Sequence, residues 1–160
     1  MRSRFVQNNR LDAVRIECVE LDKKSRDSLP KLLAGLQYIY VTRELNEAVC
    51  DRLDRHILSG KQKTGRPGMS LWEIFVMAMI RMNMDLDYDK LQDQVNHHVA
   101  IRGILGVHSQ HVFEGAHYYE LQTIKDNVCL LDEAVLQEIN AELVKAGHRI
   151  KKKTRKPPVS

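Results

Sequence analysis

The stretch SLWEIFVMAMIRMNM, residues 70–84, decides the fold. Ser70 can accept a hydrogen bond from the first backbone N–H groups of a helix, and Glu73, three positions later, completes a capping box. Apolar residues then occupy nearly every side of the helix, which predicts a helix buried on all sides. The stretch is too short and too polar to span a bilayer, which needs about 20 apolar residues. We expect no membrane partner.

Helical patterns also dominate the residues before this stretch. Ser28 can cap a short helix that has Pro30 in its first turn and runs to about Tyr40. Thr42 can cap a longer helix over residues 43–58. The apolar residues of that second helix recur at helical spacing and are Leu45, Val49, Leu53 and Ile57. Only short runs, at residues 13–19 and 38–41, have the composition of strands.

Four more helices are expected after residue 84. Their candidate N-caps have side chains that can accept a hydrogen bond, and are Asp87, Asn96 and Asp132. Gly106 and Gly147 are expected to end the second and the fourth of these helices. The third is expected over residues 119–131, with its apolar residues on one side.

The sequence therefore predicts an all-α fold, a multi-helix bundle of about six or seven helices with a helix-turn-helix-like second half. The expected regions are an N-terminal helical region over 1–60, a basic, glycine-rich linker over 61–69, a helix-turn-helix-like domain over 70–147 and a basic, disordered tail over 148–160.

Charge is concentrated near the end of the chain. The net charge is +4, from 25 basic and 21 acidic residues. Six of the basic residues lie within 149–156, so the remainder of the chain is slightly acidic. The three cysteines are far apart, which favours neither a disulfide framework nor a zinc site and fits the cytoplasm.

Several residues suit contacts with DNA. The basic residues of the linker and of the tail can bind phosphates, and are Lys61, Lys63, Arg66, Arg149, Lys151, Lys152 and Lys153. The helix over 119–131 is a candidate to read base edges through residues expected on its outer face, Tyr119, Gln122, Thr123, Lys125 and Asn127. The helix over 97–105, with His98 and Arg102, competes for that role, and a solvated polar face is the alternative for both.

No catalytic, metal or cofactor site is expected. Asp85, Asp87 and Asp89 have the spacing that begins a calcium loop, but Lys90 and Asn96 stand where that loop needs glycine and glutamate. Five histidines lie within 97–117 without the spacing of a zinc site. No motif for a nucleophile, a phosphate-binding loop or a dinucleotide occurs.

Over residues 65–150 the chain resembles the N-terminal region of bacterial insertion-sequence transposases of the DDE type, particularly the group labelled ISNCY. The matching residues are Gly65 to Ser70, Asp87, Tyr88, Asp89, Leu91, Asn96, Arg102, Leu105, Gly106, Thr123 to Asn127, Leu130, Leu131, Glu138, Ile139, Asn140, Gly147 and His148.

The resemblance implies a bacterial, nucleoid-associated protein that recognises the terminal inverted repeats of its element. In that family the catalytic acidic residues belong to a later domain, so no catalytic residue is carried over and this chain is not expected to be an enzyme. The alternative is a helical dimerisation or protein-interaction module, a non-functional transposase remnant, suggested by the amphipathic helices over 43–58 and 131–146. Under that alternative, a second copy of the chain is the expected partner, in a homodimer.

Overall fold

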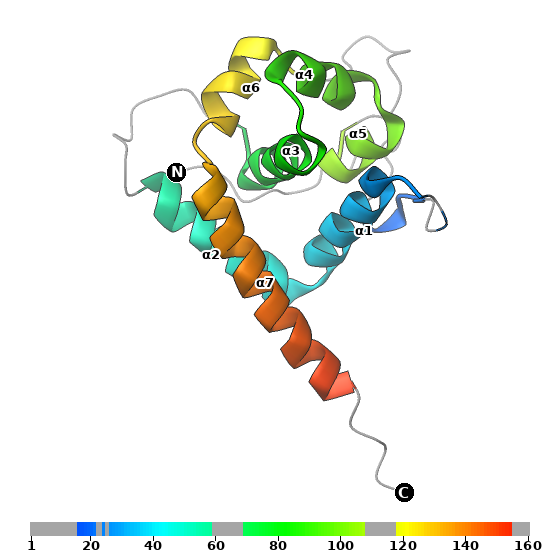
Figure 1. Ribbon diagram of the computed structural model, residues 1–160, viewed down its shortest axis with the longest axis vertical. Helices are drawn as coiled ribbons and strands as arrows, with labels where there is room; N and C mark the ends of the chain where they lie inside the picture. Colours follow the sequence, from blue (N-terminus) through cyan, green and yellow to red (C-terminus); the bar gives the residue numbers. More distant parts are fainter. Residues whose placement is uncertain (1–15, 22–23, 25, 59–68, 108–117, 155–160) are drawn as a thin grey trace, which may run out of the picture.

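The computed structural model describes residues 16–21, 24, 26–58, 69–107 and 118–154, and in the last helix it describes side chains as far as Lys145. Over these residues the chain forms one 3₁₀-helix, seven α-helices and no strand (Figure 1). They are η1 (Ile16–Cys18), α1 (Ser28–Val41), α2 (Arg43–Leu58), α3 (Leu71–Met84), α4 (Tyr88–His97), α5 (Val99–Leu105), α6 (Leu121–Val128) and α7 (Glu133–Thr154). The prediction of an all-α bundle is confirmed.

Helix α3 is the centre of the fold. It contacts each of the other six α-helices, and Leu71 and the residues from Ile74 to Ile80 are buried. The indole Nε1 of Trp72 donates to the carbonyl oxygen of Ile104 at 2.9 Å, which fixes α5 against α3. The rings of Tyr40 and Trp72 pack with their centroids 5.1 Å apart, which adds an aromatic contact between α1 and α3.

Three of the predicted caps are confirmed. Ser70 Oγ accepts from the backbone N–H of Glu73 at 3.4 Å. Asp87 Oδ1 accepts from Lys90 N at 2.8 Å, and Asp132 Oδ1 accepts from Val135 N at 2.9 Å. The third cap, Asp132, starts the helix that runs alongside α2 (Figure 1). Asp87 therefore caps α4, as predicted, and its spacing from Asp85 and Asp89 needs no calcium loop to explain it.

The two halves of the chain share one core. The buried apolar residues form a single cluster that includes Leu36 of α1, Leu53 of α2, Phe75 of α3 and Ile139 of α7. An ion pair between Arg52 and Glu138 also joins α2 to α7. The boundary predicted at residues 61–69 therefore separates helices along the chain but does not separate two cores. Residues 59–68 themselves lie outside the described residues.

Several predicted element boundaries are wrong. Helix α7 continues through Gly147 to Thr154, because a glycine inside a helix costs only about 1 kcal/mol relative to alanine. The predicted tail of 148–160 is thus helical in its first half. Ser28 is the first residue of α1 and Asp27 takes the N-cap position. The strand-like run at 38–41 is the last turn of α1, where burial of Ile39 overrides its local composition.

Helix α5 lies close to the segment that follows η1. A Cβ added at Gly103 would lie 2.8 Å from Val19 Cγ2, nearer than two carbons can approach. Gln37 of α1 secures the same segment, because its Nε2 donates to the carbonyl oxygens of Ile16 and Val19 at 2.9 and 3.0 Å. Glycine at position 103 therefore permits this close packing.

We predict that Gly103→Ala destabilises the protein. Overpacking costs about 1–3 kcal/mol, whereas alanine gains only about 1 kcal/mol over glycine inside a helix. Chemical denaturation followed by circular dichroism should show a lower free energy of unfolding. Gly35→Ala is the matched control, because it also lies within a helix but has nothing within 4 Å of the added methyl, and it should stabilise the protein. In a Val19→Ala background Gly103→Ala should no longer destabilise, and a loss that persists there would contradict the packing explanation.

Candidate functional site

The outer face of α6 carries two of the residues predicted to contact DNA. Gln122 and Lys125 are exposed, as is Asp126, and Thr123 is half-buried. Gln122 Nε2 donates to Asp126 Oδ1 at 2.7 Å, one helical turn away. The face therefore offers a lysine and an amide that is held in place by a carboxylate. Its apolar side, with Ile124 and Val128, faces the core.

Two other residues of the predicted outer face are buried, which corrects the prediction. Helix α6 is shorter than expected, so Tyr119 precedes it in an extended segment and is only 2% exposed. Asn127 is 7% exposed, and its Nδ2 donates to the carbonyl oxygen of Thr123 at 2.7 Å. Neither side chain is available to a duplex in this structure. The predicted helix over 119–131 placed both side chains on the outer face, whereas the structure buries them.

The competing candidate, residues 97–105, does not form an exposed helix. Residue His98 separates α4 from α5, and every residue from Ile101 to Leu105 is buried. Arg102 is fully buried, and its Nη1 donates to the carbonyl oxygen of Val95 at 3.1 Å. Burial lowers the pKa of Arg102, with the nearby Tyr119 acting in the opposite direction. The prediction that Arg102 faces DNA is therefore wrong, and α6 is the better candidate of the two.

His98, and not the predicted Asn96, caps α5. The N-cap of α5 is His98, whose Nδ1 accepts from Ile101 N at 3.3 Å. Asn96 is instead buried within α4. Its side-chain oxygen accepts from Tyr119 N, and its side-chain nitrogen donates to the carbonyl oxygen of Tyr119. The sequence pattern could not distinguish the two, because both side chains can accept a hydrogen bond from a helix N-terminus.

The basic candidates divide into two groups. Lys61, Lys63 and Arg66 lie outside the described residues. Arg149, Lys151, Lys152 and Lys153 lie on the helical backbone of α7, whose end extends beyond the other helices in Figure 1. The first turns of the same helix are anchored by buried Val135, Leu136 and Ile139. The basic run is thus continuous with a helix that is part of the core.

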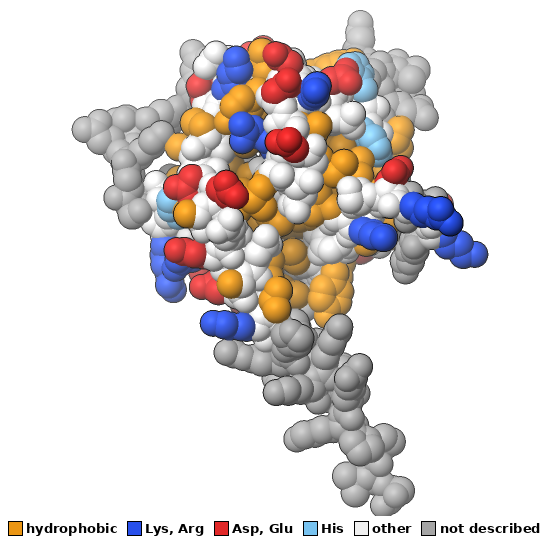
Figure 2. Space-filling view, in the orientation of Figure 1, with side chains coloured by type: hydrophobic (Ala, Val, Ile, Leu, Met, Phe, Trp, Pro, Cys, Tyr) orange, Lys and Arg blue, Asp and Glu red, His pale blue; other side chains and the backbone are white. Residues whose placement is uncertain are grey.

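The described body carries the opposite charge. Among its described side chains, 18 are acidic and 11 are lysine or arginine. On the face shown in Figure 2, acidic and basic side chains are intermixed over the helices at the top of the view, around α4 and α6. Any strong attraction for a polyanion must therefore come from residues outside this body.

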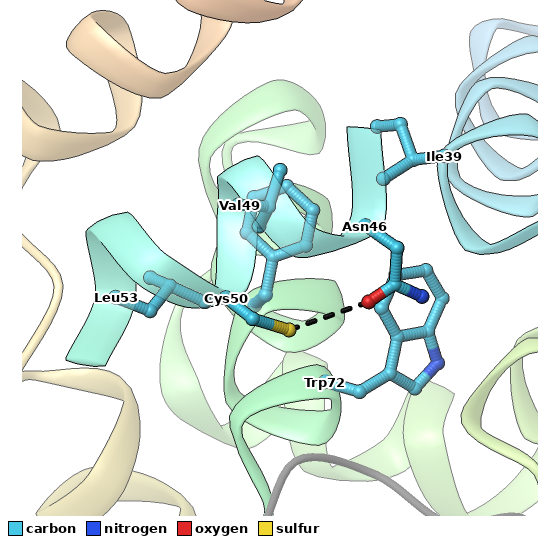
Figure 3. Close-up of a pocket in the computed structure, with 7 residues that line it drawn as sticks. Ile39, Asn46, Val49, Cys50, Leu53 and Trp72 are labelled. Atoms are coloured by element: carbon cyan, nitrogen blue, oxygen red, sulfur yellow. Dashed lines mark hydrogen bonds between the residues drawn. The ribbon is translucent and has the colours of Figure 1, made fainter. Parts of the chain in front are cut away.

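A pocket between α1, α2 and α3 is too small to bind a ligand. It is lined by Ile39, Asn46, Val49, Cys50, Leu53, Trp72 and Phe75 (Figure 3). Cys50 Sγ donates to Asn46 Oδ1 at 3.3 Å, and Asn46 Nδ2 donates to the carbonyl oxygen of Tyr40 at 3.1 Å. The pocket has no space for the centre of a water molecule.

The described part of the chain also lacks the side-chain groupings of a metal site. No group of histidine, cysteine or carboxylate side chains there could hold a metal ion. Of the five histidines within 97–117, His108, His111 and His117 lie outside the described residues. Among the described helices, none has the length and apolar character needed to cross a membrane.

Comparison with known proteins gave no match to a protein-family model, to a curated protein or to a solved structure.

We predict that acidification destabilises the protein through His98. Burial lowers the pKa of His98 from its ordinary value of 6.5, and its Nδ1 must be unprotonated to accept from Ile101. The folded state therefore binds fewer protons than the unfolded state, so this contribution to stability is complete above pH 6.5 and is lost as the pH falls below it.

Unfolding free energies of wild type and His98→Asn, measured from pH 7.5 to 5, test this assignment. Asparagine caps helices well and does not titrate, so the variant should lose less stability than wild type over this range. His98→Ala should lower stability at pH 7.5 by about 1 kcal/mol, through loss of the cap. Identical pH profiles for wild type and His98→Asn would exclude His98 as the titrating group.

Proposed function

We propose that this chain is a DNA-binding portion of a bacterial insertion-sequence transposase, which recognises the terminal inverted repeats of its element and leaves strand transfer to acidic residues elsewhere. Support comes from the ordered set of residues over 65–150 that resembles such proteins. Such a chain would act in the cytoplasm, on the nucleoid.

The observation that carries the proposal is the continuity of α7. Arg149 and Lys151 to Lys153 lie on one helix with the buried residues Val135, Leu136 and Ile139. A basic run on an anchored helix loses less conformational entropy on binding than a basic run in a free tail. It can also hold the body in one orientation relative to the phosphate backbone.

The acidic body and the basic end of α7 suggest that different elements bind phosphates and read bases. The acidic body repels phosphates, so the nonspecific attraction is left to basic residues outside it, among them those at the end of α7. Helix α6 then offers Gln122 and Lys125 to base edges. At 1.5 Å per residue its eight residues span about 12 Å, comparable with the width of the major groove.

The protein-interaction alternative was suggested by the amphipathic helices over 43–58 and 131–146. The two amphipathic helices, α2 and α7, pack against each other within one chain. Their apolar residues Leu45, Leu53 and Leu136 are buried in the common core. The apolar residues at this contact are therefore covered within the chain, whereas Val144 of α7 is 58% exposed.

Binding to inverted-repeat DNA and to scrambled DNA of the same composition, measured by fluorescence anisotropy over a series of salt concentrations, tests the proposed function. We expect tighter binding to the inverted repeat and a linear fall of log affinity with log salt. Equal affinity for both duplexes would contradict sequence recognition, and absence of binding at low salt would contradict the proposal altogether.

We further predict that the four substitutions Arg149→Gln, Lys151→Gln, Lys152→Gln and Lys153→Gln together weaken binding to both duplexes at least about tenfold and reduce the salt slope by up to about 3.6. The control replaces Arg26, Arg43, Arg55 and Lys31 of the body with glutamine, which changes the net charge equally. It should leave the slope nearly unchanged. Equal losses in the two variants would assign the effect to net charge and not to α7.

A further inference from the structure

The segment that leads into α6 is held by side chains of α4. Asn96 Oδ1 accepts from Tyr119 N at 2.8 Å, and Asn96 Nδ2 donates to Tyr119 O at 3.0 Å. Gln92 Nε2 donates to the same carbonyl oxygen at 3.2 Å. Asn96 is 6% exposed, so these bonds form in a site that excludes most water. The backbone of Tyr119 is therefore fixed two residues before α6 begins.

The side chain of Tyr119 connects the same point to α3. Its hydroxyl donates to Glu73 Oε2 at 2.8 Å, and Glu73 Oε1 accepts from Ser70 Oγ at 2.8 Å. Both carboxylate oxygens thus have donors. Burial, with the charge of Glu73 beside it, raises the pKa of Tyr119 well above its ordinary value. The tyrosine therefore stays protonated and continues to donate at physiological pH.

The N-cap residue of α6, Glu120, does not add a side-chain hydrogen bond at the start of the helix. A helix of eight residues is too short to be stable by itself in water, so its position depends on what it contacts. The apolar side chains of Ile124 and Val128, further along α6, are buried in the core. Apolar packing of this kind has little directional preference, whereas hydrogen bonds fix direction.

We propose that Tyr119 is a positioning residue for the outer face of α6, acting through the hydrogen bonds to Glu73 and Asn96 rather than by touching DNA. This inference rests on the proposed function, because it assigns sequence reading to Gln122 and Lys125. The network sets the direction in which α6 leaves the segment at residues 118–120, and therefore where those two side chains meet a groove. A misplacement of about 1 Å is enough to disrupt a hydrogen-bonded site.

The test is Tyr119→Phe in the full chain, with anisotropy on inverted-repeat and scrambled DNA. Phenylalanine removes the hydroxyl but keeps the ring and the backbone bonds to Asn96. We expect the ratio of the two affinities to fall about tenfold. We expect affinity for scrambled DNA and its salt slope to be unchanged, because phosphate contacts belong to α7. Glu73→Gln, which can still bond to both hydroxyls, should retain most of the ratio.

A stability-matched control separates positioning from general destabilisation. Ile39→Val removes one methylene from α1, which does not contact α6, at a cost of about 0.5–1.5 kcal/mol. It should leave the affinity ratio unchanged, and hydrogen exchange in α6 should accelerate only in Tyr119→Phe. Should Tyr119→Phe bind the inverted repeat with the wild-type ratio, the positioning role is overturned while the proposed function stands. An equal fall in Ile39→Val also overturns it.

The wild-type measurement separates the two failures. A wild-type chain without preference for the inverted repeat overturns the proposed function, and the positioning role with it. If Tyr119→Phe proves too unstable to measure, Gln92→Leu is the second variant, because it removes only the bond to Tyr119 O. It should lower the affinity ratio less than Tyr119→Phe does, about two- to threefold. A ratio equal to wild type in Gln92→Leu would count against the network.

Discussion

Burial of α3 is the constraint on which the rest of the structure depends. A helix that is apolar on nearly all sides must be covered on all sides, and in this chain each of the other α-helices contacts it. The cover comes from α1, α2 and α7 on one side and from α4, α5 and α6 on the other (Figure 1). The helices before and after residues 59–68 therefore cannot fold around separate cores. Neither half alone would cover α3.

The polar groups of α3 supply the direction that apolar packing lacks. Glu73 in its first turn binds Tyr119, Trp72 binds the carbonyl oxygen of Ile104, and the Arg81 guanidinium lies 4.3 Å from the centre of the Tyr88 ring. Each of these contacts reaches a different helix or the segment leading into it. Side chains of α3 thus orient the elements around it, in addition to filling the core between them.

The sequence was sufficient where local chemistry decides the structure. The bounds of α2 and α3 and the caps at Ser70, Asp87 and Asp132 follow from residues within one turn of the helix end. The sequence was insufficient where residues far apart along the chain decide whether a side chain is buried. Tyr119, Asn127 and Arg102 all have polar groups that suit a DNA surface, and only the partners brought by folding bury them. Of the predicted α6 face, Gln122 and Lys125 remain exposed, and Gln122 lies on the side of the helix away from buried Ile124 and Val128.

Under the proposed function, affinity and specificity belong to different parts of the molecule. Acidic side chains of the body repel a duplex within about a Debye length, roughly 10 Å at 0.1 M salt, so α6 can approach a groove only if a stronger attraction brings it there. The helix that carries the basic run, α7, packs at its first turns on the same core as α6, since α3 contacts both helices. Attraction at α7 therefore also orients α6. Because the network around Tyr119 fixes α6 on that core, a change there should weaken the preference for the inverted repeat without altering how strongly phosphates are held.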